Sequence, residues 1–171
     1  QWTFERFFFC LEFIFGDSNK SPDEKPAIKT HLNAFYIDKY EVTNAQFKKV
    51  FPNHTYGERR DRHPVRGLSW KQASDYAAAV SKRLPTEMEW EKAARGSSGR
   101  EYPWGAVFRE DMANIKSGFD PDTQPVGKYK KGVSEYGCYD MSGNVYEWVS
   151  DWYNPYPGNT EVLLDYGTVF K

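Results

Sequence analysis

The chain has 171 residues, of which 39% are hydrophobic and 18% are aromatic. This length suits one domain with a sizeable core, and the aromatic share excludes an intrinsically disordered chain. The net charge of -1 excludes a broad basic surface for nucleic acid. The basic run at residues 58–62 is interrupted by acids, as expected for a solvated loop.

Two stretches of β-structure are predicted near the N-terminus. Residues 7–15 form one or two strands ending at Gly16, and residues 28–40 form another stretch rich in β-forming side chains. The apolar start is interrupted by charges and is too short to span a membrane, which takes about 20 residues. A buried strand is preferred there over the remnant of a signal peptide, because no small-residue cleavage pattern follows. Whether the first 12 residues belong to the domain stays open.

Three helix starts follow, each with a Ser or Thr and then a Gln or Glu three residues later. In such a capping box each side chain accepts a backbone N–H of the helix start. The boxes are Thr43 with Gln46, Ser69 with Gln72, and Thr86 with Glu89. The second helix is predicted to reach about Ser81, with a core-facing stripe of Trp70, Ala73, Ala77 and Val80. The third runs from Glu87 to Arg95 and ends at Gly96.

After Gly96 the sequence is punctuated by Gly, Pro, Asn and Asp, and no helical period persists. Short strands and turns are predicted around residues 102–105, 125–129 and 145–149. No linker and no internal repeat is visible. The sequence therefore predicts a single α+β domain over residues 1–171, with two or three short helices and much irregular loop.

Seven strings in a fixed order resemble the sulfatase-modifying-factor family, whose founding member is the formylglycine-generating enzyme. They are FYIDKYEVTNAQF (35–47), HPVRGLSWKQASDY (63–76), KRLPTEMEWEKAARG (82–96), YPWG (102–105), MANIKS (112–117), PVGKY (125–129) and YGCYDMSGNVYEWVSDWY (136–153). The resemblance runs from about Phe13 to Tyr153 and implies a C-type-lectin-like fold with little regular secondary structure. The chain departs from the family at Ala77 and Ala79, where relatives often carry Cys and Trp.

The resemblance implies a structural calcium site in the loop at residues 140–147. The implied ligands are the side chains of Asp140 and Glu147 and the backbone carbonyls of Gly143 and Val145. Calcium takes six to eight oxygen ligands in flexible geometry, and a glycine lets carbonyls converge. On the residues alone, Asp140 capping a turn and Glu147 lying in a solvated strand is the simpler interpretation.

A second calcium site is implied at Asn114 and the carbonyl of Ile115. An acid from the following loop would complete it, and Asp120 and Asp122 are the two candidates. The loop is shorter than is usual in the family, so the choice between the two acids stays open.

The family's founding enzyme oxidises a sulfatase cysteine to formylglycine with copper(I) held by two cysteines, and soft thiolates select that ion. The family places these cysteines in the C-terminal third of the domain, beyond an RGGSW-like segment, which residues 1–171 do not contain. The two cysteines present are Cys10 and Cys138, and Cys138 is expected to be a small buried hydrophobe. No catalytic residue is assigned, and copper is expected only if a further segment supplies the cysteine pair. The domain is accordingly expected to be incomplete at its C-terminus or to be a variant that lost the site.

Two other functions are weighed. The iron-dependent sulfoxide synthases of the same superfamily need a histidine-rich site, but His31, His54 and His63 are scattered singly. The stronger alternative is a non-catalytic binding or accessory subunit of an extracytoplasmic complex, with a sulfatase-type peptide or other subunits as protein partners. The aromatics Trp152, Tyr153 and Tyr156 serve such a partner or pack on further sequence. Calcium loops and the absence of cytosolic cofactor motifs favour a periplasmic or secreted location.

Overall fold

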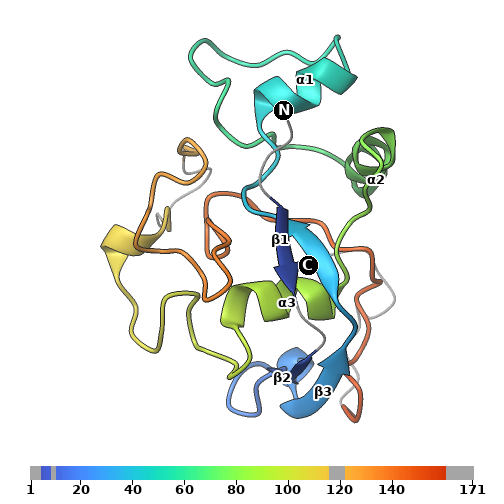
Figure 1. The fold of residues 1–171 in the computed structure, drawn as a ribbon, viewed down its shortest axis with the longest axis vertical. Helices are drawn as coiled ribbons and strands as arrows, with labels where there is room; N and C mark the ends of the chain where they lie inside the picture. The colour runs from blue at the N-terminus through green and yellow to red at the C-terminus, as the bar shows by residue number, and fades with distance from the viewer. Residues whose placement is uncertain (1–4, 9–10, 116–121, 161–171) are drawn as a thin grey trace.

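A long antiparallel ribbon opens the fold in the computed structural model, which describes residues 5–8, 11–115 and 122–160. Strand β1 (Glu5–Phe8) pairs with β4 (Phe35–Asp38), and β2 (Leu11–Phe15) pairs with β3 (Ile28–Leu32). Both pairings follow one register, from Glu5 opposite Asp38 to Phe15 opposite Ile28. The two predicted stretches of β-structure are confirmed as the two arms of this ribbon (Figure 1).

The tip of the ribbon is a tight loop, and only glycine fits at the first residue of that loop. Gly16 has a φ of +80°, and a Cβ there would lie 2.6 Å from the carbonyl oxygen of Glu24. The backbone N–H of Asp17 donates to the same oxygen over 2.7 Å, and a short 3-10 helix, η1 (Pro22–Glu24), fills the loop. This close backbone approach explains why the first arm ends at Gly16.

All three helix starts are confirmed, and all three capping boxes are formed. The helices are α1 (Asn44–Val50), α2 (Trp70–Ala79) and α3 (Glu87–Arg95). Helix α2 ends two residues before the predicted Ser81, which adopts a φ of +59°. The predicted stripe is confirmed, since Ala77 is buried and the other three members are partly buried.

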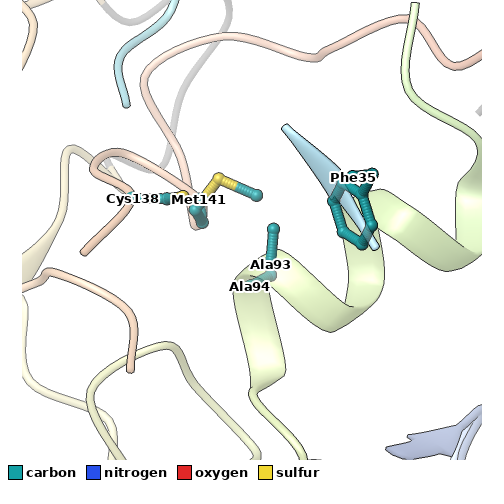
Figure 2. Packing of buried hydrophobic residues seen from close by; sticks show 5 residues of the cluster. All are labelled: Phe35, Ala93, Ala94, Cys138 and Met141. Atoms are coloured by element: carbon teal, nitrogen blue, oxygen red, sulfur yellow. The ribbon is translucent and has the colours of Figure 1, made fainter. Parts of the chain in front are cut away.

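Helix α3 lies against the ribbon and supplies the centre of the core (Figure 1). Ala93 and Ala94 of α3 meet Phe35 of β4 and two residues of a later loop, Cys138 and Met141. Figure 2 shows these side chains converging from the three segments. Small alanines on α3 let the loop approach the helix closely, so the core positions residues 138–147.

A buried charged network fastens the ribbon tip to α3. The Oε1 atom of Glu91 accepts the Gly16 N–H over 2.7 Å and Nη1 of Arg95 over 2.6 Å. Its Oε2 accepts the hydroxyl of Tyr156 over 3.2 Å, and the Tyr156 ring stacks on Phe15 with centroids 4.0 Å apart. Tyr156 is therefore a core residue, and the predicted interpretation as an exposed aromatic is wrong for it. Trp152 is 60% exposed, and Tyr153 is partly buried with its hydroxyl on Asp23.

The chain after Gly96 is mostly loop, as predicted. The described residues of this part contain one 3-10 helix, η2 (Glu110–Met112), and an isolated bridge between Tyr102 and Gly105. Short strands and turns are predicted around residues 145–149, and the structure forms no strand there. Trp148 instead donates its indole N–H to the Leu68 carbonyl, and the indole of Trp70 donates to the Val149 carbonyl. Single side-chain hydrogen bonds of this kind, rather than the hydrogen bonds of a β-sheet, hold residues 145–149 in place.

The architecture is thus the α+β fold that the sequence predicts, with three short α-helices and two antiparallel strand pairs among the described residues. Among the described residues no helix is both long and apolar enough to cross a membrane.

Candidate functional site

Three carboxyl groups from two distant segments lie within electrostatic range of one another beside the core. Glu41 precedes α1, whereas Asp140 and Glu147 belong to the loop that Cys138 and Met141 anchor on α3. The charges of Asp140 and Glu147 both act on Glu41. We call these three residues the acidic cluster.

Glu147 is held by α3. One carboxylate oxygen, Oε2, accepts the indole N–H of Trp90 over 3.0 Å. The residue is partly buried, and burial raises the pKa of Glu147 to about 7. The predicted alternative of a solvated strand residue does not describe this environment.

Asp140 sits at the sharp start of the loop, with a φ of +59°. Its Oδ2 accepts the backbone N–H of Gly127 over 2.7 Å. Burial raises the pKa of Asp140 despite this bond. Asp140 thus both fastens a neighbouring turn and contributes a carboxyl group to the cluster.

Glu41 is the most buried member, with 9% of its surface exposed. Burial, followed by the charges of Glu147 and Asp140, raises the pKa of Glu41 to about 9. Its Oε2 accepts the side-chain N–H of Asn144 over 2.6 Å, whereas its Oε1 has no hydrogen-bond partner in the described part of the chain. A buried carboxylate oxygen without a partner is energetically costly. This environment therefore favours either protonation of the Glu41 carboxyl or binding of a cation beside it.

The acidic cluster carries no compensating charge of its own. Over residues 5–8, 11–115 and 122–160, no Lys or Arg forms an ion pair with these three side chains. The same residues contain no group of three or more His, Cys, Asp or Glu side chains placed to hold a metal ion by themselves. A cation here would therefore need backbone and amide oxygens besides two carboxylates, and such mixed oxygen sets suit hard cations.

The loop between Asp140 and Glu147 packs its backbone closely against Asn114. Gly143 has a φ of +106°, and a Cβ there would lie 2.7 Å from the Asn114 carbonyl oxygen. The Gly143 carbonyl accepts the Val145 N–H over 3.0 Å, which occupies one of its two lone pairs. The four residues predicted for the first calcium site, Asp140, Gly143, Val145 and Glu147, thus lie in one tight loop.

The second predicted site is only partly formed from described residues. Asn114 is 5% exposed, and its Oδ1 has no hydrogen-bond partner within the described residues. The Asp122 carboxylate is exposed and forms a bidentate pair with Arg60, with 2.7 Å between Oδ2 and Nη2. That Arg60 bond lowers the pKa of Asp122. The Asp122 carbonyl, in contrast, accepts Nδ2 of Asn114 over 2.9 Å. Asp120 lies outside the described residues, and the Ile115 side chain is 47% exposed.

Two residues of this region, Glu41 and Asn144, are not predicted from the sequence. Glu41 lies in the string FYIDKYEVTNAQF, directly before the first capping box, and Asn144 lies between two predicted carbonyl ligands. Asn144 has a φ of +69°, a conformation that Asn tolerates better than most residues. Nothing in the local pattern indicates their contact, because they are joined only in the folded chain.

The family model described as "Sulfatase-modifying factor enzyme 1-like domain" matches residues 12–170. The chain belongs to this family. It is 37% identical to the serine/threonine-protein kinase pkn1 of Chlamydia caviae, a match covering 83% of this chain and 26% of that protein. It is 29% identical to the formylglycine-generating enzyme of Bos taurus, over 84% of this chain and 56% of that enzyme. The chain therefore spans only about a quarter of the first relative and about half of the second.

A solved structure places the fold in the same group. "Treponema denticola variable protein 1" superposes with a TM-score of 0.77 at 22% identity, over 96% of this chain and 78% of that one. At this identity the likeness concerns the fold alone, and it confirms the predicted fold of the sulfatase-modifying-factor family. The kinase name of the Chlamydia relative belongs to a protein four times as long as the match, so it carries no activity to this chain.

The one cysteine of this family member that the structure describes is Cys138. It has no exposed surface and belongs to the core around α3 (Figure 2). Cys10 lies outside the described residues. Cys138 is thus the buried small hydrophobe that the sequence predicts, and it is closed to a substrate cysteine.

A groove of about 510 Å³ opens next to the acidic cluster. Phe15 of β2, Leu32 of β3 and Met88 of α3 line it, together with residues 147–149 and 151–157, among them Glu147, Trp148 and the exposed Trp152.

Proposed function

We propose that these residues form a non-catalytic sulfatase-modifying-factor domain, whose loops are cross-linked by calcium and which serves as a binding or accessory module. The observation that carries the calcium proposal is the acidic cluster. The buried Glu41 and the partly buried Asp140 and Glu147 all have raised pKa values, and neither they nor the unpaired Glu41 oxygen have a basic partner among the described residues. Buried charges are normally paired or bound to metals.

The proposed ligands are the carboxylates of Asp140 and Glu147 and the carbonyls of Gly143 and Val145. All four donors are hard oxygens in an irregular loop, which suits calcium better than zinc or copper. Calcium-binding modules outside the cytoplasm work at about 10⁻⁴ to 10⁻³ M free calcium. A site that needs carbonyls besides two carboxylates fits that range, and it supports the proposed periplasmic or secreted location.

Thermal unfolding with and without calcium tests the stabilising role. Saturation at about 100 times the dissociation constant stabilises the fold by about 2.7 kcal/mol, so the melting temperature rises when calcium replaces EDTA. Asp140→Asn and Glu147→Gln abolish that rise, whereas the exposed control Asp75→Asn keeps it. Equal melting temperatures for the wild type in both solutions would refute the proposal.

The absence of oxidase chemistry is proposed for these 171 residues only. Copper(I) needs a pair of thiolates, but Cys138 is buried and bonded into the core of the domain. The full 171-residue chain, loaded with copper, is incubated in air with a cysteine-containing sulfatase peptide, and the peptide mass is followed. The expected result is an unchanged peptide, and a mass shift to formylglycine would contradict it.

The groove beside Trp152 supports a protein partner. Its apolar lining and the 60% exposed indole suit an extended peptide with an apolar side chain. A labelled sulfatase-type peptide is expected to bind with an affinity that Trp152→Ala weakens. Tyr146→Ala, which removes a still more exposed aromatic side chain outside the groove lining, is expected to leave the affinity unchanged. Equal affinities for both variants would rule this groove out as the peptide site.

A further inference from the structure

The side chain of Asn144 uses its full hydrogen-bonding capacity. Its Nδ2 donates to Oε2 of Glu41 over 2.6 Å and to the carbonyl of Gln124 over 3.2 Å. Its Oδ1 accepts the Gln124 N–H over 2.8 Å and Nδ2 of Asn114 over 3.3 Å. A backbone N–H can only donate and a carbonyl can only accept. The two bonds to Gln124 therefore fix which end of the Asn144 side-chain amide is the oxygen and which is the nitrogen.

The orientation of Asn114 follows from Asn144. The Asn114 Nδ2 is directed to two acceptors, Oδ1 of Asn144 and the carbonyl of Asp122. Its Oδ1 therefore takes no part in these bonds, and this atom is buried without a partner in the described part of the chain. The backbones are joined as well, because the Asn144 N–H donates to the Asn114 carbonyl over 3.2 Å. An amide oxygen held in this way is presented for a ligand rather than for a protein donor.

We propose that Asn144 is a positioning residue that couples two cation sites. One is the loop at residues 140–147, and the other uses Oδ1 of Asn114. The inference rests on the proposed calcium function and extends it, because Asn144 touches no ion itself in this arrangement. Partners that orient a metal ligand typically change metal affinity by about 10-fold to 100-fold when they are removed. Coupling between sites is reciprocal, so a change at either site alters affinity at the other.

Asn144→Gly is the most direct variant. Glycine suits the φ of +69°, so the substitution deletes the amide without straining the backbone. Ser81→Gly is the matched control, because Ser81 is exposed and has a φ of +59°. Calcium titration by calorimetry is expected to show two binding steps in the wild type and in Ser81→Gly. In Asn144→Gly one step is weakened by about 10-fold or more.

Asn114→Ala provides the reciprocal measurement. It also tests the coupling between the two sites if Asn144→Gly does not fold. It is expected to remove one step and to weaken the step that Glu147→Gln abolishes. Two unchanged steps in either folded variant would overturn the inference while leaving the calcium site intact. A single wild-type step that Glu147→Gln abolishes would also overturn the coupling alone. No calcium binding by the wild type would overturn both proposals together.

Discussion

Replacing Glu91 by alanine tests whether the buried network holds the ribbon tip on α3. Glu91 accepts three hydrogen bonds, from Gly16, Arg95 and Tyr156, and bonds to a charged acceptor contribute about 1.5–3 kcal/mol each. Two effects reduce the total. Burial raises the pKa of Glu91 in spite of these bonds, and Tyr156 keeps a second acceptor in Glu87.

Arg95 also stays satisfied in this variant, since it donates to three backbone carbonyls besides Glu91. The Gly16 N–H is the group left unpaired. We therefore expect a loss of about 3 kcal/mol, at the low end of the range of about 3–5 kcal/mol for breaking a buried ion pair. The wild-type and variant free energies of unfolding are measured in urea by tryptophan fluorescence.

Asp75→Ala is the matched control. Asp75 pairs with Lys71 at the same four-residue helical spacing as Glu91 and Arg95, but on an exposed surface. An exposed pair of this kind contributes about 0.5 kcal/mol or less. Losses of equal size in the two variants would refute the reasoning, because burial would then add nothing to the same ion-pair geometry.

Three further predictions concern local structure and pH. Thr86→Ala removes the cap of α3 and is expected to cost about 1 kcal/mol in urea unfolding; no change would mean that packing alone defines the helix start. Gly143→Ala is expected to destabilise the fold, because Gly143 has a positive φ and a Cβ there would lie 2.7 Å from a backbone oxygen. Gly57→Ala is expected to be neutral, because Gly57 meets neither condition. Similar melting temperatures for the two variants would contradict this. Without calcium, the Glu41 carboxyl keeps its proton up to a pKa of about 9, far above its ordinary 4.5. Its stabilising contribution is therefore complete below about pH 4.5 and is lost as the pH rises towards 9, and Glu41→Gln should flatten the stability profile across that window. A wild-type profile as flat as the variant's would disprove the burial of the Glu41 carboxyl.

The helix starts could be predicted because their signals are local. Each capping box lies within four consecutive residues, and each is formed in the structure. The two arms of the ribbon were also predictable from β-forming side chains and from Gly16. Their pairing in one register needed the structure, because the tip loop sets it.

The site could be predicted only in part. The four residues of the first predicted calcium site share one loop, so a motif reveals them. Glu41 and Asn144 lie 103 residues apart in sequence, and no local pattern predicts their hydrogen bond. Tyr156 was misjudged for the same reason, since its burial depends on stacking with Phe15 from the first arm of the ribbon.

Calcium titration of the metal-stripped protein by isothermal calorimetry tests the central claim most directly. The proposed calcium site predicts saturable binding, release of protons into solution as the ion displaces them from the acidic cluster, and loss of a binding step in Glu147→Gln. A wild-type protein that binds no calcium at millimolar concentration would contradict the account. The acidic cluster would then be a set of protonated structural carboxyl groups.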